Sequence, residues 1–130
     1  MKRELTLSHD PIVDAATQMS DGMGAVVTFH GVVRGTEDGE AITAIDYEAN
    51  AEMARHQFGL IFDALEERWP VESVRLVHRL GIVSVNEPSL WVEIIAPHRA
   101  EAFEACQFLI NEIKEKVPIW KRPRMYFLPF

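Results

Sequence analysis

Cysteine is almost absent from this chain of 130 residues, which contains Cys106 alone. A single thiol excludes an internal disulfide and any zinc site built from several cysteines. The sequence also lacks a set of His, Cys and carboxylate residues at metal-ligand spacing, and it has no glycine-rich phosphate loop. We therefore expect neither a metal ion nor a bound cofactor.

Long apolar runs and a net positive charge are also lacking. No window approaches the roughly 18 uninterrupted apolar residues of a membrane span, and the N-terminal Met-Lys-Arg-Glu-Leu has no apolar signal-peptide core. The net charge of −7 argues against general nucleic-acid binding, because phosphate backbones are met by basic faces. We expect a cytoplasmic protein that binds neither membranes nor nucleic acid.

The length and the hydrophobic periodicity predict one α+β domain over residues 1–130. Short alternating segments predict strands at 4–7, 25–34, 42–48, 74–78, 81–85 and 90–95. A period near 3.6 predicts long helices at 50–69 and 98–117, and Asp10-Pro11 predicts the start of a shorter one at 11–19. Hairpins are expected to pair 25–34 with 42–48 and 81–85 with 90–95, which favours a mostly antiparallel sheet with two long helices.

Each long helix carries an apolar stripe that we expect to face the core. The first stripe is Ala54, Phe58, Ile61, Phe62, Leu65 and Trp69. The second stripe is Phe103, Cys106, Ile110, Ile113 and Val117. Cys106 is therefore predicted to be buried packing.

The basic run Lys114-Glu-Lys-Val-Pro-Ile-Trp-Lys-Arg-Pro-Arg124 holds five of the thirteen Lys and Arg residues of an acidic chain. Pro118 ends the second long helix, and Trp120 is expected to anchor the following turn against the core. Lys121 could then fold back towards Lys114, and the two could hold an anion. The alternative is that Lys114 and Lys116 are solvated cations that stabilise a helix C-terminus.

Three further residues are candidates for anion binding. Arg34 ends a predicted strand beside a glycine, and His98-Arg99 begins the second long helix, where free N–H groups attract anions. Local capping or solvation is the alternative for each, and His78-Arg79 is interpreted as structural. Sixteen residues of helix separate His98 from Lys114 by roughly 24 Å. If both serve one site, two subunits must build it, as in a two-fold dimer.

Several segments between residues 24 and 122 together resemble one known family. They are Gly24-Ala-Val-Val-Thr-Phe-His-Gly-Val-Val-Arg34, Tyr47-Glu-Ala, Arg68-Trp-Pro70, His78-Arg-Leu-Gly81, Ala96-Pro-His-Arg99, Ala102-Phe-Glu-Ala105 and Lys114-Glu-Lys-Val-Pro-Ile-Trp-Lys121. Taken in collinear order, this set resembles the large, catalytic subunit of molybdopterin synthase, the MoaE family.

The resemblance implies a sulfurtransferase of molybdenum cofactor biosynthesis with an α/β-hammerhead-like fold. Such an enzyme converts cyclic pyranopterin monophosphate into molybdopterin by installing the two dithiolene sulfurs. Its sulfur donor is a small ubiquitin-like subunit with a C-terminal Gly-Gly thiocarboxylate. The expected assembly is a heterotetramer, in which a central homodimer of large subunits carries one small subunit at each end.

The same resemblance assigns roles to residues. It implies that Lys114 and Lys121 are catalytic, and that Lys116 stands where a basic residue is usual. It also implies that Arg34, His98 and Arg99 bind the substrate, with His98 and Arg99 coming from the opposite subunit. The chain has no Gly-Gly tail, so we expect it to accept sulfur rather than carry it.

Two rival interpretations stay open at this stage. One is a non-catalytic dimeric relative that keeps the anion pocket and serves as a scaffold, and the other is a free-standing anion-binding domain. The sequence also departs from the family pattern, because Asn50 stands where an aromatic residue is common and the chain ends in the apolar stretch Met125–Phe130. We expect that stretch to pack into the groove or to meet a partner.

Overall fold

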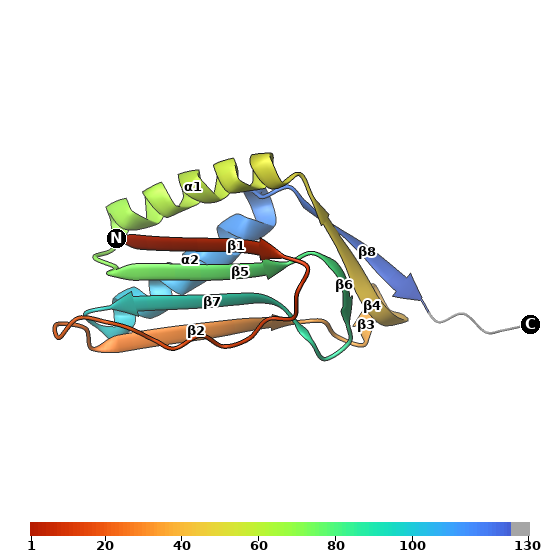
Figure 1. The fold of residues 1–130 in the computed structure, drawn as a ribbon, viewed down its shortest axis with the longest axis horizontal. Helices are drawn as coiled ribbons and strands as arrows, with labels where there is room; N and C mark the ends of the chain where they lie inside the picture. Colours follow the sequence, from red (N-terminus) through yellow and green to blue (C-terminus); the bar gives the residue numbers. More distant parts are fainter. Residues whose placement is uncertain (126–130) are drawn as a thin grey trace, which may run out of the picture.

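The computed structural model describes residues 1–125, which form two sheets and two helices (Figure 1). The main sheet has the strand order β1 (Lys2–Ser8), β5 (Ser73–Arg79), β7 (Pro88–Ala96) and β2 (Ala25–Val32). The second sheet consists of β3 (Thr36–Glu37), β4 (Glu40–Ala49), β6 (Gly81–Ser84) and β8 (Ile119–Met125). The helices are α1 (Ala51–Arg68) and α2 (Arg99–Lys116). The predicted α+β class is confirmed, since all pairings except β1 with β5 are antiparallel.

Both helices pack on one face of the main sheet, where they enclose the larger core (Figure 1). Alternate residues of the central strand β7, such as Val92 and Ile94, face these helices. The side chain of Asn50 begins α1 by accepting a hydrogen bond from the Met53 N–H at 3.0 Å, as expected of an N-cap.

The predicted stripe of α1 is confirmed. Its buried residues are Ala54, Phe58, Ile61, Phe62 and Leu65, and the partly buried Trp69 packs against the same core. The stripe of α2 was predicted with one error. Cys106 and Ile113 are buried, but Phe103 is 61% exposed. The face of α2 that packs on the sheet and on α1 instead buries Ala102, Ala105 and Leu109. The two small alanine side chains let α2 lie close to these neighbours.

The predicted hairpins are wrong, because the chain changes sheets where pairing with the next strand was expected. Strand β2 pairs with β7, while β4 pairs with β3, β6 and β8. Likewise β6 joins the second sheet and β7 the main sheet, with Asn86 in the left-handed conformation at the corner between them. The one tight hairpin is β3 to β4, whose Asp38-Gly39 turn has positive φ at both residues.

The predicted helix at 11–19 is also wrong, because residues 9–24 form an irregular segment with only a short turn. This segment crosses the face of the main sheet opposite the helices, where polar contacts hold it. Thr17 donates to Glu93 at 2.7 Å, and the Ala16 carbonyl accepts from Arg75 at 3.1 Å. These sheet contacts override the local preference for a helix.

Strand β8 was not expected either, since residues 119–125 are rich in charge and include Pro123. A proline and charged residues are tolerated at a sheet edge, and β8 pairs only with β4. Trp120 is 54% exposed on this strand, so the predicted anchoring of the turn by Trp120 is wrong. The expected packing concerned Met125–Phe130; Met125 ends β8 and is 42% exposed, and residues 126–130 lie outside the described residues.

Candidate active site

A cavity of about 730 Å³ opens at the junction of the main sheet, the C-terminal half of α2 and the second sheet. It is lined by Phe29, His30, Gly31, Val32, Arg34, Tyr47, His78, Ser89, Leu90, Ile110, Ile113, Lys114, Val117, Ile119 and Lys121. Residues from β2, β4, β5, β7, α2 and β8 therefore meet at this one place.

The floor of the cavity is a row across the main sheet. Leu90 of β7 is the register partner of His78 on β5 and of Gly31 on β2, so all three lie side by side. A Cβ atom at Gly31 would lie 3.3 Å from the Cβ of Leu90, which is tighter than usual packing. Glycine at this position therefore keeps the floor open.

One face of α2 forms a wall of the cavity. Ile110, Ile113, Lys114 and Val117 are spaced three and four residues apart, so they share that face. Lys114 lies in the last helical turn, where the helix dipole also favours a cation.

The second sheet brings Lys121 to the opposite side. Lys121 on β8 is the register partner of Tyr47 on β4, and side chains of paired residues project from the same face. Lys114 and Lys121 therefore line the same cavity, as the predicted return of the chain after Pro118 requires. Arg34, which is exposed two residues beyond β2, adds a third strong cation.

The charges of the lining all have one sign. The lining includes Arg34, Lys114, Lys121 and two histidines, and it has no Asp or Glu. Among residues 1–125, none of these three strong cations has a carboxylate at ion-pair distance. In a chain with a net charge of −7, this cavity can attract an anion.

The other cations of the basic run are paired. Lys116 Nζ lies 2.8 Å from Glu112, Arg122 lies 3.1 Å from Glu48, and Arg124 lies 3.0 Å from Asp46. None of these three lines the cavity. Of the five cations in the basic run, Lys114 and Lys121 therefore line the cavity, and the other three form ion pairs outside it.

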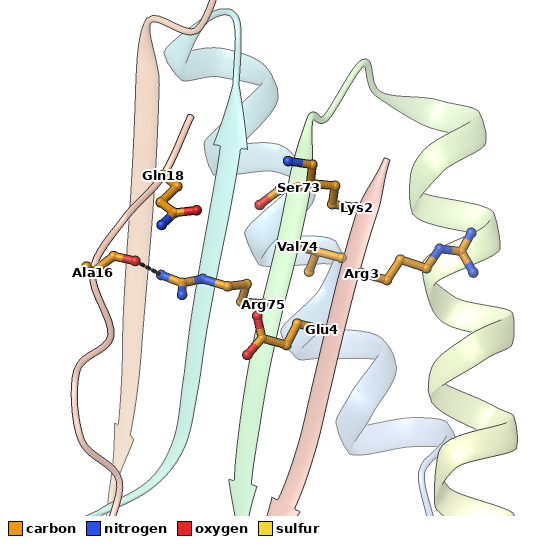
Figure 2. Close-up of a pocket in the computed structure, with 8 residues that line it drawn as sticks. All are labelled: Lys2, Arg3, Glu4, Ala16, Gln18, Ser73, Val74 and Arg75. Carbon is orange, nitrogen blue, oxygen red and sulfur yellow. Dashed lines mark hydrogen bonds between the residues drawn. The ribbon is translucent and has the colours of Figure 1, made fainter. Parts of the chain in front are cut away.

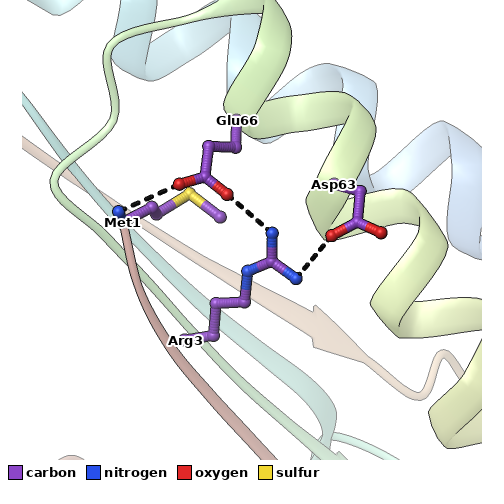
Figure 3. A network of polar contacts seen from close by, with 4 residues as sticks. All are labelled: Met1, Arg3, Asp63 and Glu66. Carbon is purple, nitrogen blue, oxygen red and sulfur yellow. Dashed lines mark hydrogen bonds and ion pairs between the residues drawn. The ribbon is translucent and has the colours of Figure 1, made fainter.

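A second cavity, of about 530 Å³, lies over the opposite face of the main sheet (Figure 2). Its arginines are already engaged. Arg75 binds Glu93 at 2.8 Å, and Arg3 binds Asp63 at 2.8 Å and Glu66 at 2.7 Å (Figure 3). Glu4 also lines it, so this cavity offers less free positive charge than the first.

Residues 1–125 were also compared with the requirements of a metal centre and of a membrane-spanning helix. Within residues 1–125, no three His, Cys, Asp or Glu side chains gather closely enough to hold a metal ion. Neither helix of that range is long and apolar enough to span a membrane. We therefore place the candidate active site in the basic cavity.

A family model described as MoaE protein matches residues 3–116. The chain belongs to the MoaE family. A relative from Thermoplasma volcanium, named molybdopterin synthase catalytic subunit, is 43% identical over 76% of this chain and 72% of its own length. Relatives with the same name from Homo sapiens and Rattus norvegicus are longer. The match with this chain covers 60% of the human protein and 50% of the rat protein.

Solved structures agree with this membership. The crystal structure of molybdopterin synthase from Staphylococcus aureus is 32% identical, with a TM-score of 0.82 over 95% of this chain and 90% of that one. A Helicobacter pylori structure is described as a complex of subunits 1 and 2 of molybdopterin-converting factor. It shares the fold at 19% identity, with a TM-score of 0.69 over 95% of this chain and 88% of that one.

His98 and Arg99 lie at the opposite end of α2 from the basic cavity of this MoaE chain. They begin that helix and do not line the cavity, whereas Lys114 is in its last turn. The His98 N–H donates to Glu101 at 3.3 Å, and the His98 ring lies 3.4 Å from the same carboxylate. Both residues are exposed. The structure therefore keeps these two predicted site residues apart from the others, as helix length alone requires.

His78 and Tyr47 also line the cavity, although neither was predicted as a site residue from the sequence. Their rings meet edge to face, with centroids 5.3 Å apart and planes at 71°. Burial lowers the pKa of His78. The hydrogen bond to the Arg79 carbonyl opposes this shift, and the charge of Lys121 adds to it. Burial raises the pKa of the Tyr47 hydroxyl. Their presence in the quoted motifs His78-Arg-Leu-Gly81 and Tyr47-Glu-Ala was the available signal.

Cys106 is buried at 5% exposure, as predicted. Burial raises the pKa of its thiol, so it stays protonated at neutral pH and is a poor nucleophile. The cavity can therefore bind and polarise anions with its lysines and arginine, and it can exchange protons through His78, but Cys106 does not line it.

Proposed function

We propose that this chain is the catalytic subunit of a molybdopterin synthase. It transfers sulfur from the thiocarboxylated C-terminus of a small ubiquitin-like subunit to cyclic pyranopterin monophosphate, making the molybdopterin dithiolene. One observation carries the proposal: a cavity that, among residues 1–125, has three cations without an ion-pair partner and no carboxylate in its lining, in an acidic chain of the MoaE family. Both reactants, a phosphate ester and a thiocarboxylate, are anions that such a cavity attracts.

Lys114 and Lys121 are the catalytic groups of this proposal. They line the same cavity from α2 and β8, so an acyl group bound there would have its developing oxyanion stabilised by ammonium charge. Arg34 binds the phosphate at the rim, since a guanidinium suits phosphate oxygens. Lys116 is kept as a substrate-binding candidate, although its ammonium group pairs with Glu112.

A second copy of the chain supplies His98 and Arg99. The two residues lie at the exposed start of α2, where backbone N–H groups and a cation could meet an anion held mainly by a neighbouring subunit. In a two-fold dimer each site then combines the basic cavity of one chain with His98 and Arg99 of the other. The ubiquitin-like subunits bind at the outer ends of this dimer.

Sulfur transfer from a thiocarboxylated carrier tests the function. Lys114→Ala and Lys121→Ala should each reduce kcat/KM by about 10²-fold or more, because each removes charge stabilisation inside the site. The matched control is Arg122→Ala, next to Lys121 on β8 but paired with Glu48 outside the cavity. This control should stay within about twofold of the wild-type chain, since exposed ion pairs contribute little.

The same assay separates the enzyme from a scaffold. A non-catalytic relative would bind the carrier subunit and transfer no sulfur, with the wild-type chain as inactive as the lysine variants. If Lys114→Ala kept full activity, Lys114 would not be a catalytic residue, but the proposed function would stand.

A further inference from the structure

His78 differs from the three strong cations of the basic cavity in its burial and its chemistry. Lys114, Lys121 and Arg34 are exposed, whereas His78 is 6% exposed and sits in the floor. A lysine or arginine is protonated at neutral pH and cannot accept a proton, whereas a neutral imidazole can. Burial lowers the pKa of His78, so its ring is neutral at pH 7.

The hydrogen bonding of His78 fixes which nitrogen is basic. Nδ1 lies 2.8 Å from the Arg79 carbonyl oxygen, and a carbonyl only accepts, so the proton is on Nδ1. Nε2 then carries the lone pair. Within residues 1–125 this atom has no hydrogen-bond partner, yet it is not among the fully buried polar atoms without one. Nε2 therefore keeps access to the cavity that His78 lines.

The charges around His78 keep that lone pair free. Tyr47 of β4 contacts the ring edge to face, and burial raises the pKa of its hydroxyl, so Tyr47 is neutral as well. The other titratable groups of the lining are Lys121 of β8, Lys114 of α2, His30 of β2 and Arg34 just beyond β2. No carboxylate lines the cavity to stabilise a protonated imidazole there.

The proposed sulfur transfer needs such a base. When the thiocarboxylate sulfur has bonded to the pterin carbon, the carrier's acyl carbon and the substrate share that sulfur as a thioester. The sulfur is delivered only when the bond from acyl carbon to sulfur breaks and a water oxygen takes its place. Water attacks an acyl carbon much faster when a positioned base removes its proton.

We propose that His78 is the general base of this step, with Nε2 taking a proton from the attacking water. The assignment rests on the proposed function. An oxygen lone pair of water forms the new bond to carbon as the proton moves to Nε2. The tetrahedral adduct then expels sulfur with its bonding electron pair, leaving a thiolate on the pterin and a carboxylic acid on the carrier. The acid loses its proton to solvent, and no oxidant or reductant is needed.

His78→Asn is the variant that isolates this role. An asparagine amide can still donate to the Arg79 carbonyl near the position of Nδ1, but it offers no basic nitrogen in place of Nε2. In single-turnover sulfur transfer, the rate should fall by about 10²-fold to 10⁴-fold while binding of the carrier subunit stays unchanged. His56→Asn, on the exposed side of α1, is the matched control and should keep the wild-type rate.

The pH profile distinguishes a base from a structural histidine. The wild-type rate should decline on the acid side, below the ordinary histidine pKa of about 6.5, because protonated His78 cannot accept a proton. The His78→Asn rate should lack this decline. If His78→Asn does not fold, the wild-type profile decides alone, and a rate that stays flat from about pH 8 down to the pH at which the protein unfolds overturns the assignment.

The outcomes for the two proposals differ. If the wild-type chain transfers no sulfur from a thiocarboxylated carrier that it binds, both proposals fail. If it transfers sulfur, and His78→Asn does so at the same rate with the same pH profile, only the role of His78 is wrong.

Discussion

Glu93 is a charged residue that is 1% exposed on the face of the main sheet crossed by residues 9–24. Burial alone would raise the pKa of its carboxyl. Hydrogen bonds from Arg75 and Thr17 and the charge of Arg75 outweigh burial, so the pKa is lowered. An ionised carboxylate at this depth is tolerable only while Arg75 stays beside it.

Arg75→Met should therefore lower the free energy of unfolding by about 3–5 kcal/mol at neutral pH, because it leaves the Glu93 charge buried without its partner. Urea unfolding measures this. Arg3→Met is the control, since Arg3 pairs with Asp63 and Glu66 near the surface (Figure 3) and should cost about 1 kcal/mol or less. Equal losses in the two variants would contradict the account of Glu93.

Acid should have opposite effects on the contribution of Glu93 to stability in the wild-type chain and in Arg75→Met. In the wild-type chain the lowered pKa of Glu93 contributes stability above the ordinary glutamate pKa of about 4.3, and this contribution is lost as pH falls through the lower folded value. In Arg75→Met we expect burial to raise that pKa instead. Mild acid should therefore reduce the difference in the free energy of unfolding between this variant and the wild-type chain. A difference that does not change from about pH 7 to pH 5 would contradict this.

At the scale of the elements, Asn50 shows how a residue outside the family pattern acts locally. Its side chain caps α1, the helix that supplies Ala54, Phe58, Ile61, Phe62 and Leu65 to the larger core. Asn50→Ala should lower the free energy of unfolding by about 1 kcal/mol, whereas Asn50→Ser should cost little because serine also caps. Thermal unfolding checks this, and equal effects of the two substitutions would show that capping is not the role of Asn50.

The long helices and most strands could be predicted from the sequence because their apolar periods are local. The pairing of strands could not, since a strand such as β6 has the same pattern whether it returns along β7 or joins β4. Residues 11–19 show the converse, because contacts from Thr17 and Ala16 to the sheet outweigh their helical pattern.

Some residues of the candidate site could likewise be predicted from the sequence, and others could not. The approach of Lys121 to Lys114 followed from Pro118 and from the clustering of charge, which are visible in the sequence. His78 could not be assigned to the site, because a histidine at a strand end has the same sequence context whether it packs or lines a cavity. Only the row from Gly31 through Leu90 to His78 distinguishes the two.

For the whole molecule, the two ends of α2 make a shared site testable. In the proposed dimer, Lys114→Ala would remove one half of every site, and Arg99→Ala would remove the other half. In mixed dimers of these variants one of the two sites is intact, so mixing should restore about a quarter of wild-type activity after random exchange. A mixture no more active than its separate parents, in chains shown to exchange, would exclude the shared site.

We propose that this chain moves sulfur from a carrier to a pterin in its basic cavity. The direct measurement is a single-turnover reaction with a carrier whose thiocarboxylate sulfur is isotopically labelled. The account predicts that the label appears in the dithiolene product and that the carrier ends with a plain carboxylate, with both changes lost in Lys114→Ala. Bound carrier that keeps its label in the presence of the wild-type chain and substrate would contradict it.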